Sequence, residues 1–364
     1  MIKIFLYLLS FILPASLSAQ EINIRNIPLS ETFSTQSLAT FIRANYKTDK
    51  ERFYAIHHWV ARNIKYSKET LYELKHDSDN DTRIAEALKQ RKGVCENFAA
   101  IFNDIAGKCG LTSFIVDGYT KQGGRLDRSG HNWCAVLLDN EWFLCDTTWD
   151  KDAQSDYKYF LADPLNIIET HMPFDPMWQL LNFPIKHNEF IGTALPDKKN
   201  DYFNFKDSIK AYNQLSYLEK LKTTVKRIGV IPVHNDLLKN QMAYLEMKIS
   251  IVYEDQDMNL YNSAVNDFNI AIKAFNNFAL LHNDPSAATT PLSSLLKLLN
   301  EASTATLSAN QKIEDIGKNM INPQYDPSVL QNRLEFLNRE VKKYTAILKS
   351  VPSKEPGSSK IFNE

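Results

Sequence analysis

The first half of the chain carries helical and strand-like hydrophobic patterns in turn. From Glu51 to Tyr66 the apolar side chains recur at helical spacing, which predicts an amphipathic helix. A short helix is expected over residues 84–90. Another is expected from Cys95 onward, with Gly110 as its C-terminal cap.

Strand-like patterns follow these helices. The β-branched and aromatic run Ser113–Tyr119 predicts a strand, whereas residues 121–130 contain three glycines and several charges and predict a mobile loop. His131–Leu138 and Glu141–Trp149 read as two strands joined by a tight turn at Asp139-Asn140. Helices followed by an antiparallel sheet indicate an α+β domain.

The pattern changes after a polar, proline-containing stretch at residues 191–201, which predicts an interdomain linker. Apolar residues then recur at steps of three and four over residues 261–275 and 330–348, which favours a bundle of four to six helices. The expected organisation is an α+β domain over residues 20–192, an all-α helical domain over 202–350 and a disordered tail over 351–364.

Residues 1–19 have the pattern of a secretory signal peptide. Lys3 is followed by the apolar run Ile4–Leu13 and by small residues that fit cleavage after Ser18 or Ala19. The run is too short to span a membrane, for which a helix needs about 20 residues, and no later segment is apolar enough. An exported protein, periplasmic or extracellular and with no membrane span, is therefore expected.

Composition and charge limit the number of domains and the class of protein, but they do not identify a binding partner. A length of 364 residues favours two domains, and 44% apolar with 23% charged residues is ordinary for a globular protein. The 42 basic residues nearly balance the 43 acidic ones. Nothing in this balance suggests binding to nucleic acid or to an acidic membrane surface.

Three polar residues in the first domain suggest nucleophilic catalysis. Cys95 begins a predicted helix, where free backbone N–H groups favour a thiolate and can bind an oxyanion. His131 opens a strand directly after a glycine-containing loop and is the candidate base. Counting from the hairpin turn places Asp146 opposite Trp133 and diagonal to His131 on the same face, where its carboxylate can orient the imidazole.

Several segments resemble the transglutaminase-like superfamily, a group with a papain-like cysteine-protease fold. They are IHHWVARNIKYS, AEALKQRKGVC, GVCENFAAIFNDIAGKCGL, IVDGY and GHNWCAVLLDNEWFLCDTTWD, and the later YFLADP and THMPFDPMWQLL are similar to the subgroup related to the kyphoscoliosis peptidase. The resemblance covers about residues 50–185. It implies a catalytic helix packed on an antiparallel sheet, with Cys95 as nucleophile, His131 as base and Asp146 as the orienting carboxylate.

One departure from the family pattern affects the substrate. Many members have Gln-Gly-Tyr after the cysteine, where this chain has Glu96-Asn97-Phe98. The triad is untouched, but the substrate preference stays open. Position alone makes Gln90 and Tyr66 candidates for the second donor of an oxyanion hole.

The other cysteines and histidines have simpler interpretations. Cys109 lies on the apolar face of its helix and is expected in the core. Cys134 and Cys145 should be direct neighbours across the hairpin, and two packed thiols are favoured over a disulfide. The His57-His58 pair lacks partners at metal-site spacing, so neither a metal nor another cofactor is expected. His171 is expected to be structural.

These observations favour an enzyme that acts on a peptide or protein substrate. The expected reaction is hydrolysis of a peptide or amide bond through a thioester on Cys95. Two alternatives remain open. One is a transglutaminase that crosslinks proteins through an amine acceptor. The other is a non-catalytic module in which the helical domain holds a cell-envelope protein or polymer.

Overall fold

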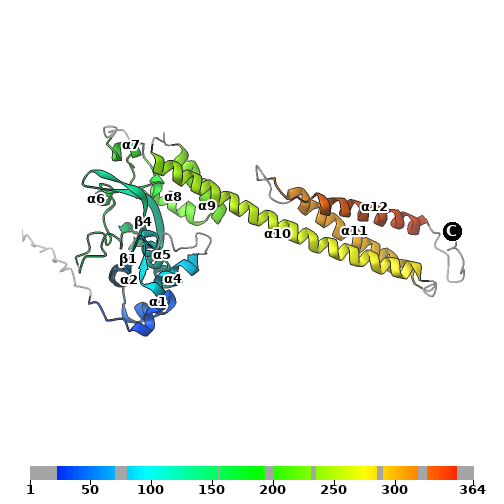
Figure 1. The fold of residues 1–364 in the computed structure, drawn as a ribbon, viewed down its shortest axis with the longest axis horizontal. Coiled ribbons are helices and arrows are strands. Elements are labelled where there is room, and N and C mark those ends of the chain that lie inside the picture. Colours follow the sequence, from blue (N-terminus) through cyan, green and yellow to red (C-terminus); the bar gives the residue numbers. More distant parts are fainter. Residues whose placement is uncertain are drawn as a thin grey trace, which may run out of the picture. The chain divides into compact units, whose positions relative to one another are not determined.

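The computed structural model describes residues 23–69, 80–154, 156–192, 201–230, 235–284, 290–318 and 326–350. The predicted signal peptide, the predicted tail and most of the predicted linker lie outside these ranges. The chain divides into two compact units (Figure 1). The first contains the described residues up to Leu215 together with Lys226–Gln241, and the second contains Ser216–Val225 and the described residues from Met242 onward.

The first unit begins with helices whose ends are set by local hydrogen bonds. At the start of α2, the Thr48 side chain accepts a hydrogen bond from the Glu51 N–H while the Glu51 carboxylate accepts one from Thr48 N–H. Gly110 adopts a positive φ of 80° just beyond α5 and ends it, as predicted. The elements are the 3-10 helix η1 (Leu29–Thr32), α1 (Thr35–Asn45), α2 (Asp49–Asn63), α4 (Asn80–Gln90) and α5 (Cys95–Lys108).

A four-stranded antiparallel sheet of order β5-β4-β3-β6 follows. Asp139 and Asn140 both have positive φ and form the predicted two-residue turn, and the register pairs Cys134 with Cys145 as counted from that turn. The strands are β3 (Thr112–Gln122), β4 (Arg125–Leu138), β5 (Glu141–Cys145) and β6 (His171–Pro173), and a separate parallel pair joins β1 (Lys65–Tyr66) to β2 (Lys92–Gly93).

The prediction of a mobile loop over residues 121–130 is wrong. Strands β3 and β4 continue through this segment, with Lys121 paired to Leu126 and Gln122 paired to Arg125. Gly123 and Gly124 have positive φ values and make the turn of a hairpin. The polar composition reflects strand ends that lie at the surface, not a missing strand.

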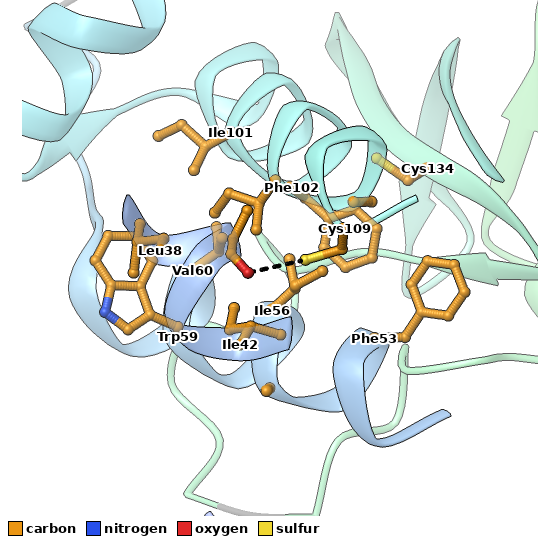
Figure 2. Packing of buried hydrophobic residues seen from close by; sticks show 14 of the residues in the cluster. Leu38, Ile42, Phe53, Ile56, Trp59, Val60, Ile101, Phe102, Cys109 and Cys134 are labelled. Atoms are coloured by element: carbon orange, nitrogen blue, oxygen red, sulfur yellow. Dashed lines mark hydrogen bonds between the residues drawn. The ribbon is translucent and has the colours of Figure 1, made fainter. Parts of the chain in front are cut away.

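Helix α5 packs between the sheet and the helices α1 and α2. Ile101, Phe102 and Ile105 on α5 are buried in one hydrophobic cluster with Cys134 and Val136 of β4. The helices α1 and α2 contribute Leu38, Ile42, Phe53 and Ile56 to the same cluster. Figure 2 shows this cluster with Cys109 inside it, where the thiol donates to the Ala39 carbonyl at 3.7 Å. Cys109 is therefore a core thiol, as predicted.

Cys134 and Cys145 are free thiols although they face each other across the hairpin. Cys134 donates to the Ala99 carbonyl at 3.4 Å, and Cys145 accepts the Leu161 N–H at 3.3 Å. Each sulfur therefore has its own partner on a different element, as favoured by the sequence.

The opposite face of the sheet carries a second core. Trp133 and Ala135 of β4 alternate with Cys134 and pack with Trp178, Phe205 and Ile209. The last two belong to α8, so the first unit continues beyond residue 192. The covering elements are α6 (Pro164–Ile167), the 3-10 helix η2 (Pro176–Gln179), α7 (His187–Phe190) and α8 (Phe205–Asn213).

A buried ion pair also joins α9 (Tyr217–Gly229) to this unit. The Arg227 guanidinium binds both oxygens of Asp175, just before η2, at distances of 2.7 to 2.9 Å. Asp175 is almost fully buried. The end of α9 is thus fixed to the sheet domain, whereas the start of α9 belongs to the second unit.

The second unit is helical. The apolar repeat over residues 261–275 lies within a longer helix, α10 (Asp236–Asn283), which packs with α11 (Leu292–Asp315) and α12 (Ser328–Ser350). Five of the six apolar positions in the repeat over residues 330–348 are buried, namely Leu330, Leu334, Leu337, Val341 and Leu348, and the sixth, Tyr344, is partly buried. Within the described parts of the chain, no helix is long and apolar enough to cross a membrane.

Candidate functional site

Cys95 is the first residue of α5, and Val94 precedes it as N-cap. The Asn97 side chain accepts the Val94 N–H at 3.0 Å and lies so close to Gly93 that a Cβ there would stand 2.6 Å from the Asn97 Cβ. Gly93 therefore allows the tight approach that starts the helix. The first N–H groups of a helix have no intrahelical partner, so the N–H of Cys95, the first residue of α5, is available to an outside acceptor.

The Cys95 sulfur is half-buried and has polar neighbours. Its thiol donates to the Asn132 side-chain oxygen at 3.8 Å, and the Asn132 amide donates to Asp117 at 2.5 Å. Interaction with the Cys95 thiol is one of the causes that raise the pKa of His131, so the structure places the two side chains close to each other.

His131 lies on β4 opposite Gly118 and is almost buried. Its Nε2 is 2.6 Å from Asp146 Oδ2. Because a carboxylate only accepts hydrogen bonds, this nitrogen carries the proton, and Nδ1 is left for the thiol. This is the tautomer that a base acting on Cys95 requires.

Asp146 is brought to His131 by a turn and not by the strand pairing that the sequence predicted. Strand β5 ends at Cys145, and the Asp146 N–H donates to the Tyr159 carbonyl at 2.9 Å instead of to β4. The Asp146 carboxylate then caps its own turn, since Oδ1 accepts the N–H groups of Thr148 at 2.8 Å and Trp149 at 3.1 Å. The predicted strand over 141–149 is therefore too long by four residues, although the predicted neighbour is right.

The charged forms of His131 and Asp146 stabilise each other. Burial raises the pKa of the Asp146 carboxyl, but His131 and His171 outweigh it and hold that pKa well below its ordinary value. Burial likewise opposes the charged form of His131, yet Asp146 and Cys95 raise its pKa well above the usual range. An imidazolium–carboxylate pair is thus the stable state beside Cys95.

A second histidine, His171 on β6, also binds this carboxylate. Its Nε2 lies 3.1 Å from Asp146 Oδ2, the same oxygen that His131 contacts. The expectation that His171 is structural does not include this contact with Asp146. No local spacing signals it, because β6 reaches the site through its pairing with β3.

A further buried pair supports the turn after Asp146. His57 on α2 binds Asp150 at 2.9 Å, and Asp150 also accepts the Tyr159 N–H. The Asp150 N–H in turn donates to the Asp146 carbonyl at 3.3 Å. His57 therefore has a carboxylate partner that its sequence neighbours did not reveal.

The two candidates for a second oxyanion donor differ in position. Tyr66 pairs with Gly93 through β1 and β2, and its ring lies 6.4 Å from that of Phe98 on α5. Burial, followed by the negative charges of Cys95 and of nearby carboxylates, raises the pKa of Tyr66, so its hydroxyl remains a donor. Gln90 is exposed at the end of α4. The geometry favours Tyr66.

Among the described residues, one group of side chains is close enough together to bind a metal ion. It consists of His131, Asp146 and His171, with one ligand atom of each lying within 4.8 Å of the others. The same atoms are used in the two hydrogen bonds to Asp146 Oδ2. A metal ion would have to replace both bonds, so the arrangement fits a hydrogen-bonded carboxylate better than a metal centre.

Cys95 differs from the other three cysteines in accessibility. Burial raises the pKa of Cys109 to about 11 and of Cys145 to about 12, and it raises that of Cys134 well above its ordinary value. These three thiols are buried, whereas Cys95 is half-buried. The arrangement provides one accessible thiol, a base and an orienting carboxylate, which is the set needed for nucleophilic acyl transfer.

Comparison with known proteins gives a family resemblance for the first unit. The family model for the transglutaminase-like superfamily matches residues 36–147. The mouse kyphoscoliosis peptidase is 28% identical over 187 residues, and a nematode protein, Lim and transglutaminase domain protein ltd-1 of Caenorhabditis elegans, is 24% identical over 224 residues. These matches cover 47% and 54% of this chain but only 27% and 29% of the relatives' lengths.

A solved structure shares weaker similarity. The periplasmic domain of TgpA from Pseudomonas aeruginosa is 19% identical, with a TM-score of 0.27, over 35% of this chain and 48% of that one. The family model, the relatives and the helix-on-sheet fold agree on one assignment. Residues 36–147 of the first unit match the transglutaminase-like superfamily, and the first unit is similar in sequence to the kyphoscoliosis peptidase.

Proposed function

We propose that this chain is an exported cysteine hydrolase that cleaves peptide or amide bonds. The observation that carries the proposal is the 2.6 Å contact between His131 and Asp146, next to the Cys95 thiol at the start of α5. A cysteine at a helix N-terminus, a histidine in the correct tautomer and a buried carboxylate together supply nucleophile, base and orienting group.

The reaction has two steps, acylation of Cys95 and hydrolysis of the resulting thioester. The proton of Cys95 first passes to His131 Nδ1, which forms the imidazolium–carboxylate pair, and the resulting thiolate attacks the carbonyl carbon of the substrate. The C–N bond then breaks, the imidazolium gives its proton to the leaving amine, and a thioester remains on Cys95. Water attacks this thioester with His131 as base, which releases the acid and regenerates the thiol.

Hydrogen-bond donors around the nucleophile bind the oxyanion of the tetrahedral intermediate. The Cys95 backbone N–H, at the first turn of α5, is one donor. The hydroxyl of Tyr66, whose backbone pairs with that of Gly93, is the second. Both belong to elements that meet at the β1–β2 pair.

Hydrolysis and crosslinking share the thioester on Cys95. They differ in the acceptor of the acyl group, which is water in hydrolysis and an amine in crosslinking. The test is turnover of a broad peptide mixture, with and without a fluorescent primary amine, compared between the wild type and Cys95→Ala. Cleavage that requires Cys95 supports a hydrolase, whereas incorporation of the amine in its place supports the crosslinking alternative. Identical traces for wild type and variant would leave the non-catalytic module as the better account.

Export forms a separate part of the proposal and rests on the pattern of residues 1–19. A mature protein outside the cytoplasm that begins after Ser18 or Ala19 is expected. N-terminal sequencing of the protein recovered from each cell fraction tests it, and an intact Met1 in the cytoplasmic fraction would contradict it.

A further inference from the structure

We infer that His171 is a positioning residue for acyl transfer, which holds the Asp146 carboxylate ionised and aligned with His131. The inference rests on the proposed function of Cys95, His131 and Asp146. It assigns to His171 a role in the chemistry beyond that of a core histidine.

The contacts of His171 fix its proton. Its Nε2 faces the carboxylate at 3.1 Å and must carry the hydrogen, since Asp146 only accepts. Its Nδ1 lies 2.8 Å from the Thr170 hydroxyl, which donates to it. Burial lowers the pKa of His171, so the ring stays neutral and adds a donor without adding a charge.

The surroundings of His171 exclude water from the carboxylate. Its ring centroid lies 4.4 Å from that of Trp149, 5.1 Å from Trp133 and 5.3 Å from Tyr159. The side chains of His171 and Asp146 are both completely buried. A carboxylate in such a place needs protein donors to remain charged, because no solvent replaces them.

Asp146 has four such donors, two for each oxygen. The backbone N–H groups of Thr148 and Trp149 serve Oδ1, while His131 and His171 share Oδ2. With His171 removed, His131 would be the remaining donor to Oδ2 among these four, and the carboxylate could rotate away from it. The buried carboxyl group would then also take up a proton at higher pH.

Other titratable groups near this cluster come from several elements. The groups whose charges act on His171, on Asp146 or on their immediate neighbours are His131 and Asp127 on β4, Cys95 on α5, Tyr66 on β1, Cys134, Cys145 and Tyr159. Asp146 is the group that changes most directly with His171, because the two share a hydrogen bond.

Two substitutions of His171 distinguish a hydrogen-bond donor from a side chain that only fills space. His171→Phe keeps a ring in the aromatic surroundings but has no N–H, whereas His171→Gln can place an amide N–H near the position of Nε2. The readout is the rate at which iodoacetamide alkylates Cys95, measured against pH and located by peptide mass spectrometry.

We expect His171→Phe to slow alkylation at about pH 6 at least tenfold and to move the acid limb of the profile to higher pH. His171→Gln should restore most of the rate. His187 supplies the matched control, because it is another buried neutral histidine, bound to Tyr119 and Phe174 and not to the triad. His187→Phe should lower stability without moving the profile.

Either of two results would overturn the inference. One is a His171→Phe profile that coincides with the wild type in folded protein. The other is a His171→Gln variant as impaired as His171→Phe although equally folded by circular dichroism. A wild-type Cys95 that shows no acceleration over a small free thiol would instead refute the proposed function, so the two failures are distinguishable.

Discussion

Replacement of Asp146 by asparagine tests the electrostatic part of the site with almost no change of shape. The carboxylate accepts four N–H groups, two on each oxygen. An amide has a single oxygen, so its NH₂ group must face one of the two pairs of donors. If the oxygen keeps the backbone N–H groups of Thr148 and Trp149, the NH₂ group faces His131 and His171.

The substitution Asp146→Asn would force His131 into the wrong tautomer. Its Nε2 would have to accept a hydrogen bond, so the proton would move to Nδ1, which could no longer take the proton of Cys95. A buried charge that loses its partner costs about 3–5 kcal/mol. Since about 1.4 kcal/mol corresponds to a tenfold change in rate, Asp146→Asn should slow the reaction of Cys95 by about 10²- to 10⁴-fold.

The assay is the second-order rate of Cys95 alkylation from about pH 5 to about pH 9, corrected for the folded fraction; an unperturbed thiol has a pKa of about 8.5. Because the pKa of His131 is raised, the wild type should keep its imidazolium, and its rapid alkylation, well above pH 7. Asp150→Asn makes the same change in the His57–Asp150 pair and should lose stability while Cys95 keeps its rate. An Asp146→Asn protein that reacts as fast as the wild type at about pH 6 would refute this reasoning.

Three more predictions concern neighbouring residues. Tyr66→Phe should lower kcat about 10²-fold, as expected for one oxyanion donor, while Cys95 alkylation is unchanged; equal losses in both would indicate a structural role. Gly118→Ala should lower the free energy of unfolding by about 1–3 kcal/mol, because its Cβ would stand 2.4 Å from the Met172 carbonyl and from the Trp133 ring, whereas Gly107→Ala, in open space, should not destabilise. Arg227→Met should cost about 3 kcal/mol in urea denaturation by removing the guanidinium that binds the buried Asp175, while Lys206→Met, which breaks an exposed pair with Glu141, should cost less than about 1 kcal/mol.

The sequence reveals local features of the fold well and distant ones poorly. The turn at Asp139-Asn140 and the pairing of Cys134 with Cys145 follow from the hydrophobic alternation and the two turn residues. The hairpin around Gly123-Gly124 was missed, because strands that extend beyond the core lose the apolar alternation that marks a strand.

The same distinction holds for the candidate site. Cys95, His131 and Asp146 could be placed from a helix start and one hairpin, both of which are short-range features. The contacts of His171 with Asp146 and of His57 with Asp150 join residues 25 and 93 positions apart, through the β3–β6 pairing and the packing of α2. Such contacts depend on tertiary packing, which no local pattern records.

The most direct test of the central claim is capture of the thioester. The protein is mixed with an activated ester such as p-nitrophenyl acetate, quenched in acid and digested, and the acetyl group is located by peptide mass spectrometry. The account predicts rapid acetylation of Cys95, reversed by hydroxylamine and largely abolished in His131→Ala. Acetylation of Cys95 at the same rate in His131→Ala, or no faster than that of a small free thiol, would contradict it.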